Sequence, residues 1–124
     1  MQVKELLDKK GHDVYSISPD ATVYDALKLM AEKEIGALVV LEDGKMIGIV
    51  SERDYARKII LKGKSSKETR VREIMTSEVI HTRPDHKVQK CLSLMTKHHF
   101  RHIPVLENDR LVGILSIEDV KGVT

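Results

Sequence analysis

The chain repeats itself at a spacing of 65 residues. Residues 14–56 align with residues 79–121 without a gap, and 14 of these 43 positions are identical. Such a repeat predicts two similar units related by a pseudo-twofold axis, with clefts where the units meet. Positions kept in both copies carry shared fold or shared chemistry, whereas positions that differ can make the two clefts unequal.

The repeat also suggests how the 124 residues divide. Each copy is close to the lower size limit for an independent hydrophobic core, so the two copies are expected to fold as one body. We predict a first repeat at residues 1–62, a linker at 63–70 and a second repeat at 71–124. A shorter echo, shifted by 68 residues, matches 3–7 with 71–75; its three extra residues are expected near residues 10–12.

Each copy begins with an extended segment and a helix. The extended segments are predicted at 14–18 and 79–83. Apolar residues at positions i, i+3, i+4 and i+7 then predict helices that begin at Val23 and Val88. Thr22 or Asp20 is expected to cap the first helix, and Asp85 the second.

Each copy continues with a hairpin and a second helix. Two apolar runs around a polar turn predict hairpins at 37–50 and 103–115. Helices are predicted to follow at 51–61 and 116–120. The expected fold class is therefore α/β, with two β-α-β-β-α repeats.

Charge and cysteine content limit the classes of protein. The net charge is only +2, although residues 57–72 hold seven basic residues against Glu68, a local net charge of +6. This basic stretch lacks interleaved aromatic residues, which favours a solvated surface over a nucleic-acid site. The single cysteine, Cys91, aligns with Ala26 as a core residue and excludes an internal disulfide. With no signal peptide and no apolar run long enough for a membrane, a cytoplasmic protein is expected.

A serine and an aspartate three residues apart stand where each hairpin enters its last helix. Ser51 and Ser116 are predicted at the N-caps, where backbone N–H groups and the helix dipole favour an anion. Asp54 and Asp119 lie one turn further on and can each accept two hydroxyl hydrogen bonds. A phosphate binder beside a diol binder suits a ribonucleotide. The alternative is a purely structural capping box, but its occurrence at equivalent places in both copies favours function.

These features together resemble a known family. The β-α-β-β-α repeat, the Gly-hydrophobic-x-Ser-x-x-Asp segments at 48–54 and 113–119, and the strand His102-Ile103-Pro104-Val105 are similar to a tandem pair of cystathionine β-synthase (CBS) domains, the Bateman module. Small stand-alone prokaryotic CBS-pair proteins look closest, and the resemblance runs from about Val3 to Lys121. It implies binding of adenosine-containing ligands and pairing into disc-shaped homodimers through the helical faces.

The resemblance also implies site residues, with each cleft drawing on both copies. Asp54 or Asp119 would hold the ribose hydroxyls, and backbone groups near Thr82 or Ile17 would read the adenine edge. Ile80, Ile103 and Ile114 would sandwich the base. The first cleft would use Ser51, Arg53, Asp54, His81, Thr82, Arg83, Arg101, His102 and Ile103. The second, weaker cleft would use Ser16, Ile17, Ser18, Gly36, Ala37, Ser116 and Asp119.

The two clefts are expected to differ in charge. Arg101 aligns with Gly36, and Arg53 aligns with Glu118, so the first cleft gains arginines and the second gains an acid. Because arginine matches phosphate oxygens, we predict a phosphate-bearing ligand in the first cleft. The second would be empty, weak or selective for an uncharged adenosine group. The alternative is that both arginines are solvated or paired with nearby acids.

Five histidines lie between residues 81 and 102. His98 and His102 have the i,i+4 spacing that can hold a metal on a helix, but the repeat ends the helix at 98–99, so no metal site is predicted. His102 is instead expected beside the phosphate, where its protonation would make affinity fall as the pH rises.

The expected function is a regulatory module that senses an adenine nucleotide, with AMP as the expected ligand and ATP or ADP as alternatives. No enzyme activity is expected, because neither Ser51 nor Ser116 has a base placed beside it. The expected partners are a second copy of the chain and an unidentified regulated protein, and no membrane. The competing interpretations are a structural dimer with empty clefts, a binder of S-adenosylmethionine or of a dinucleotide, and a nucleic-acid binder.

Overall fold

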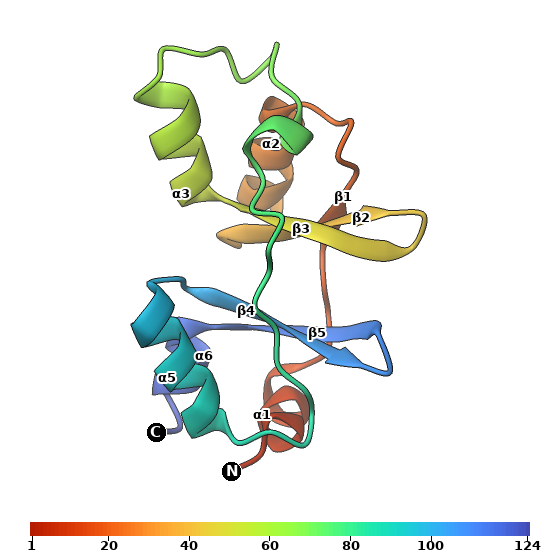
Figure 1. Cartoon of the computed structure of the whole chain (residues 1–124), viewed down its shortest axis with the longest axis vertical. Coiled ribbons are helices and arrows are strands. Elements are labelled where there is room, and N and C mark those ends of the chain that lie inside the picture. Colours follow the sequence, from red (N-terminus) through yellow and green to blue (C-terminus); the bar gives the residue numbers. More distant parts are fainter. The chain divides into compact units, whose positions relative to one another are not determined.

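The computed structural model describes the whole chain, Met1–Thr124, and it divides into two compact units (Figure 1). The central unit is Tyr15–Val79. The terminal unit combines Met1–Val14 with Ile80–Thr124. This division follows packing, so it differs from the repeat boundaries at 1–62 and 71–124, which follow sequence similarity.

The central unit holds a three-stranded sheet. Strands β1 (Ser16–Ile17) and β2 (Ala37–Glu42) pair in parallel, and β3 (Lys45–Ser51) pairs antiparallel to β2. Helices α2 and α3 cover the same face of this sheet (Figure 1). The helical elements are α2 (Val23–Lys33), α3 (Glu52–Tyr55), the π-helical continuation η1 (Ala56–Ile60) and α4 (Val71–Ile74).

The terminal unit holds one hairpin and three helices. Strands β4 (His102–Glu107) and β5 (Arg110–Ser116) pair antiparallel. Helices α1 (Val3–Lys10), α5 (Val88–His98) and α6 (Ile117–Lys121) lie on one face of this hairpin (Figure 1).

The two hairpins have the same register. Ala37 pairs with Ser51 and His102 with Ser116, and each ladder shifts at the same place, after Val40 and after Val105. Both two-residue turns have positive φ at both positions, 53° and 78° at residues 43–44 and 51° and 64° at residues 108–109. Asp, Asn and Gly tolerate such values, which suit the primed turns that match strand twist. The predicted hairpins are therefore confirmed.

The first strand of the second repeat is reduced to a single bridge, between Thr82 and Val105. In the central unit the Val39 N–H donates to the Tyr15 carbonyl, at 3.3 Å. The residue that matches Val39 in the second repeat is Pro104, which has no N–H to donate. The extended segment predicted at 79–83 consequently forms no regular strand.

One of the two predicted helix caps forms. The Thr22 hydroxyl accepts a hydrogen bond from the Asp25 N–H at 3.1 Å, as expected. The prediction for Asp85 is wrong, because Lys87 is the N-cap of α5 and gives no side-chain cap. The Asp85 carboxylate is instead held by Arg83, at 2.9 Å.

The echo segments pack on the opposite repeat. Leu7 of α1 is buried in the core of the terminal unit, among residues of the second repeat. Ile74 of α4 is buried in the core of the central unit, among residues of the first repeat. The three extra residues lengthen the first echo helix to Lys10, after which Gly11, at φ 105°, ends it.

A glycine sits under each echo segment. A Cβ on Gly48 would lie 2.8 Å from both the Met75 sulfur and the Thr76 carbonyl oxygen. A Cβ on Gly113 would lie 2.6 Å from the Leu7 side chain. Both strands therefore need a residue without a side chain at this position, so that the echo segment can pack against the strand.

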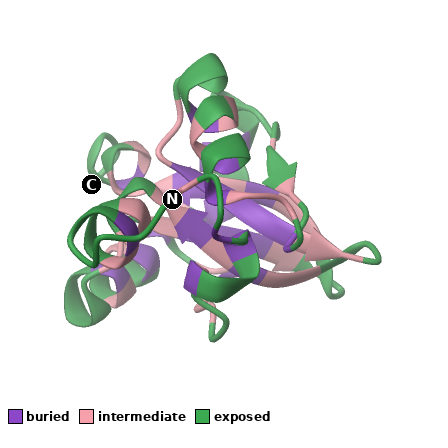
Figure 2. Ribbon diagram, turned by 90° about the horizontal axis from the view of Figure 1, so that it is seen from above, coloured by how far each residue is buried: buried purple, intermediate pink, exposed green.

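Buried residues follow the strands and one side of the helices, while the turns between paired strands are mostly exposed (Figure 2). None of the helices is long and apolar enough to cross a bilayer.

Candidate functional site

The Ser-x-x-Asp segments form complete capping boxes in both units. Ser51 and Ser116 are the N-caps of α3 and α6, as predicted. Their hydroxyls accept from the backbone N–H of Asp54 and Asp119, at 3.3 and 3.1 Å. In return, the serine N–H groups donate to the aspartate Oδ2 atoms, at 2.9 and 2.8 Å. The structural part of the prediction is thus confirmed in both copies.

The helix starts use their N–H groups internally. The Glu52 N–H donates to the Gly36 carbonyl at 3.1 Å, and the Ile117 N–H donates to the Arg101 carbonyl at 2.8 Å. Together with the boxes, these bonds consume most of the donors that an anion would need. In both segments the carboxylates of Asp54 and Asp119, and not the backbone N–H groups, are therefore the groups available to bind a ligand.

Each box aspartate is paired with a lysine that sequence reasoning missed. Lys58 Nζ lies 3.0 Å from Asp54 Oδ1, and Lys10 Nζ lies 3.1 Å from Asp119 Oδ2. Asp54 thus uses one oxygen for Ser51 and the other for its lysine, whereas both contacts of Asp119 fall on Oδ2. The spacing of four residues could have identified Lys58, but no sequence signal places Lys10 beside residue 119.

The Asp119 carboxylate is held in its ionised form. Partial burial raises its pKa, but the Ser116 N–H and the Lys10 ammonium outweigh this effect and the net pKa is lowered. The side chain remains 27 % exposed, against 14 % for Asp54. Both carboxylates can therefore still be approached by a hydroxyl donor.

Arg101 and Glu118 form an ion pair of 2.7 Å within the terminal unit. The sequence prediction placed Arg101 in the first cleft and took Glu118 as the acid of the second. The pKa of Glu118 is lowered by a hydrogen bond from its own backbone N–H and by Arg101. The alternative interpretation, an arginine paired with a nearby acid, therefore describes Arg101.

His102 lies at the start of β4, opposite Ser116, and is half-buried. Burial lowers its pKa, with the attraction of Glu118 acting in the opposite direction. The imidazole is consequently neutral at neutral pH. Any change in ligand affinity that depends on its protonation would occur below pH 6.5, its ordinary pKa.

Thr82 is fully buried and all its polar groups are engaged. Its N–H donates to the Pro104 carbonyl and its carbonyl accepts from the Leu106 N–H, both at 2.9 Å. Its hydroxyl lies 3.1 Å from His86 Nδ1.

Burial raises the pKa of the neighbouring Cys91 thiol, and a hydrogen bond with Thr82 only partly offsets this. Cys91 is therefore a core thiol, as predicted.

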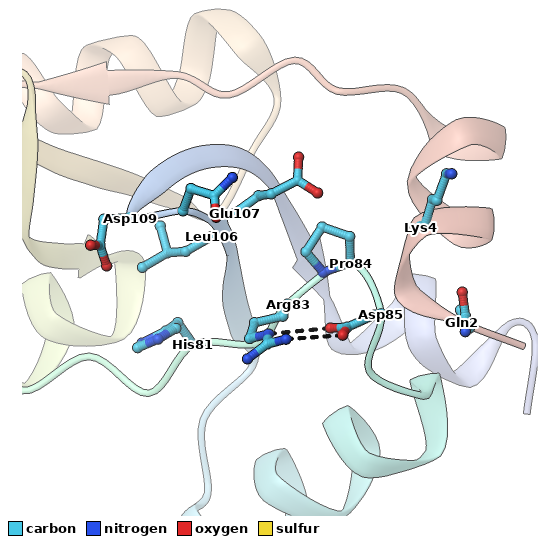
Figure 3. Close-up of a pocket in the computed structure, with 10 residues that line it drawn as sticks. Gln2, Lys4, His81, Arg83, Pro84, Asp85, Leu106, Glu107 and Asp109 are labelled. Atoms are coloured by element: carbon cyan, nitrogen blue, oxygen red, sulfur yellow. Dashed lines mark hydrogen bonds and ion pairs between the residues drawn. The ribbon is translucent and has the colours of Figure 1, made fainter.

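His81 and Arg83 line a pocket of about 620 Å³ in the terminal unit (Figure 3). Asp85 holds the Arg83 guanidinium with bonds of 3.2 and 2.9 Å, drawn as dashed lines in Figure 3. Lys4 lies on the α1 side and Asp109 on the hairpin side, so the lining carries both signs of charge. The remaining lining residues are Gln2, Pro84, Leu106, Glu107 and Asn108.

The other predicted residues occupy varied environments. Ile103 is buried in the core of the terminal unit, which leaves it little surface for a base. Ser16 and Ile17 form β1, and the Ser18 hydroxyl accepts from the Asp20 N–H at 3.1 Å. Gly36 and Ala37 lie at the start of β2, and Arg53 lies on α3.

The histidine positions match the prediction. His98 ends α5 and His102 begins β4, so the i,i+4 pair is not on one helix. No group of three or more His, Cys, Asp or Glu side chains could hold a metal ion.

Comparison with known proteins identifies the repeat. The family model for the CBS domain matches residues 3–61 and again residues 71–123. The CBS domain-containing protein CBSX3 of Arabidopsis thaliana, mitochondrial by name, is 48% identical over 106 residues, covering 82% of this chain and 52% of that protein. The chain thus spans about half the length of this curated relative.

Solved structures agree with this result. A protein with CBS domains from Burkholderia ambifaria is 46% identical, with a TM-score of 0.97 over 99% of this chain and 93% of that one. The CBS domain pair of protein MJ0100, solved with 5′-methylthioadenosine and S-adenosyl-L-methionine, is 26% identical, with a TM-score of 0.84 over 99% and 94%. The chain belongs to the CBS-domain family and carries the tandem pair that forms a regulatory ligand-binding module.

Proposed function

We propose that the chain binds an adenosine-containing ligand and acts as a ligand-sensing regulatory module, with Asp54 and Asp119 as acceptors for ribose hydroxyls. The observation that carries this proposal is the recurrence of one arrangement in two units: a part-exposed carboxylate, anchored by a serine N–H and paired with an ammonium group. The complex of the MJ0100 pair with adenosine derivatives supports the ligand class.

AMP is the ligand that we propose first, with ATP, ADP and S-adenosylmethionine as alternatives. A phosphate would have to compete with Glu118 for Arg101. The preference for a phosphate-bearing ligand therefore depends on how easily the exposed Arg101–Glu118 ion pair breaks. We retain Ser51, Arg53 and Asp54 as the preferred site and Ser116 and Asp119 as the weaker one.

Regulation would follow from linkage. A ligand shifts a conformational equilibrium only as far as it binds one state better than the other. We propose that a regulated partner protein, or a homodimer formed through the helical faces, responds to that shift. Ile60 and Leu61, which are 57% and 76% exposed at the end of η1, support an apolar contact on such a face.

The nucleic-acid alternative has less support. Within the basic stretch, Lys58 pairs with Asp54, and Arg72 pairs with Asp20 and Glu42. The Arg70 guanidinium donates to a backbone carbonyl at 2.6 Å. These contacts reduce the charge that is available to a phosphate backbone.

The decisive experiment is a calorimetric titration of ligand-stripped protein with AMP at moderate salt. We expect saturation near one site per chain, lost in Asp54→Ala and kept in Asp119→Ala. The exposed Asp13→Ala is a matched control, and circular dichroism checks that each variant folds.

Two other results would change the proposal. Two sites per chain would refute the asymmetry between Asp54 and Asp119. Absence of binding by AMP, ATP and S-adenosylmethionine would refute the ligand-sensing function and favour a structural dimer.

A further inference from the structure

In both units a lysine ammonium group contacts the aspartate of the capping box, but the two lysines come from different parts of the chain. In the central unit, Lys58 reaches Asp54 from the same helical segment, four residues further on. In the terminal unit, Lys10 reaches Asp119 from α1, which is more than a hundred residues away in the sequence. The contact is therefore repeated although the residue that makes it is not.

The repeat alignment shows that neither lysine has a counterpart. At the position of Lys58 the second repeat has Val123, at the 65-residue spacing. Lys10 lies beyond the matched echo residues 3–7, where the first copy has three extra residues. A shared ancestral pair would have left lysine at matching positions. The same contact from unrelated positions instead suggests that the aspartate requires a cation.

The three extra residues that follow the first echo segment explain how Lys10 comes to lie beside Asp119. In the central unit, the chain leaves the helix after Ile74, and the Thr76 backbone pairs with Ile49 through bonds of 2.9 and 3.0 Å. In the terminal unit, α1 continues to Lys10, whose Nζ donates to the Ile114 carbonyl at 2.7 Å. Ile114 is the residue that matches Ile49.

Each ammonium also bridges the aspartate to a backbone carbonyl. Lys58 Nζ donates to the Ile74 carbonyl at 2.7 Å, just as Lys10 Nζ donates to that of Ile114. Two anchoring contacts restrict where each Nζ can lie. A restricted cation fixes the rotation of the carboxylate that it contacts.

We infer that Lys10 and Lys58 are positioning residues of the ligand site, which hold Asp119 and Asp54 as oriented acceptors for the vicinal hydroxyls of a ribose. This inference rests on the proposed function. Lys10 contacts Oδ2 of Asp119, the oxygen that also accepts from Ser116, whereas Lys58 contacts Oδ1 of Asp54, the oxygen that Ser51 does not use.

The charges near Asp119 are few. They are the Lys10 ammonium, the Arg101–Glu118 pair and the imidazole of His102, whose lowered pKa leaves it neutral at pH 7. Lys10 forms the ion pair with Asp119, and together with the Ser116 N–H it favours the ionised form of this carboxylate.

The test compares Lys10→Met with Lys9→Met, a change of an exposed neighbour on the same helix, and with Lys10→Arg. Carbon-13 NMR titration of the aspartate carboxyls in the full chain is the first measurement. Lys10→Met should raise the pKa of Asp119, and Lys9→Met should leave it unchanged. Lys10→Arg should restore most of the wild-type behaviour, which a role in helix packing alone would not require.

AMP affinity at several pH values is the second measurement. Lys58→Met should weaken binding about threefold to tenfold relative to Lys62→Met, the range for loss of a part-exposed charged partner. In Lys10→Met, any binding at the Asp119 site should begin to fall at a higher pH than in the wild type.

The inference is overturned if the Asp119 titration is the same in Lys10→Met and Lys9→Met, or if Lys58→Met binds AMP as tightly as Lys62→Met. Should the wild type bind no adenosine compound, the proposed function fails. The NMR titration, which needs no ligand, would then still decide whether Lys10 governs the carboxylate.

Discussion

Alanine at the two repeated glycines should destabilise the two units unequally. At Gly48, a Cβ would lie 2.8 Å from the Thr76 carbonyl oxygen, a backbone atom held by two hydrogen bonds to Ile49. At Gly113, the obstacle is the Leu7 side chain, whose nearest atom is 2.6 Å away. A side chain can change its rotamer, whereas the backbone must move and strain its bonds.

The magnitudes follow from these obstacles. Overpacking costs about 1–3 kcal/mol, and weakening a backbone hydrogen bond adds about 1 kcal/mol. Alanine recovers about 0.4–1 kcal/mol by restricting the unfolded chain. We expect a loss of about 2–3 kcal/mol for Gly48→Ala and about 0–1 kcal/mol for Gly113→Ala, where an off-rotamer Leu7 costs about 0.5–1.5 kcal/mol before the gain from alanine is subtracted.

Urea unfolding can assign each loss to its unit. All three tyrosines, Tyr15, Tyr24 and Tyr55, lie in the central unit, so their fluorescence reports that unit, while circular dichroism reports both. The double variant Gly113→Ala/Leu7→Ala serves as a control, because its loss should be smaller than the sum of the two single losses. A loss in Gly113→Ala equal to or larger than that in Gly48→Ala would refute the reasoning.

Three further predictions follow from the packing and the charges. Burial lowers the pKa of His102 below 6.5, so the contribution of the neutral imidazole to folding stability is complete above pH 6.5 and is lost as the pH falls through the lowered pKa. His102→Asn should therefore flatten the plot of unfolding free energy against pH in this acidic range. Leu7→Ala should lower the free energy of unfolding by about 2–5 kcal/mol and reduce hydrogen-exchange protection in β4 and β5. Ile74→Ala should have the same effects in β2 and β3. A loss of protection confined to the repeat that follows each segment in the sequence would contradict the crossed packing. Glu118→Gln should release Arg101 and tighten any AMP binding at the Asp119 site roughly threefold while leaving adenosine binding there unchanged, and equal effects on both ligands would exclude a phosphate contact with Arg101.

Much of the fold could be predicted because it depends on local signals. The helices at Val23 and Val88, both hairpins and both Ser-x-x-Asp caps follow from periodicity and turn residues that lie close together in sequence. The failures also have local causes. Pro104 cannot donate to a parallel neighbour, so the second repeat lacks a regular first strand, and Asp85 is drawn to Arg83 instead of capping α5.

The site could be predicted less well because it depends on contacts between distant residues. The comparison of the repeats did not indicate the ion pair between Arg101 and Glu118, which both belong to the second repeat. Lys10 contacts Asp119 only because α1 packs on the second repeat, which no local pattern indicates. A residue-by-residue comparison of two repeats assigns equivalent roles and therefore misses contacts that only one repeat makes.

The crossed packing of α1 has a consequence during synthesis. The ribosome produces helix α1 before the central unit, whereas the hairpin that buries Val3, Leu6 and Leu7 follows the central unit in the sequence. At roughly 5–20 residues per second, these apolar side chains wait for several seconds while the central unit can already close. Helix α1 of the nascent chain thus leaves its apolar side chains exposed until strands β4 and β5 have been synthesised, and we expect a chaperone to bind there.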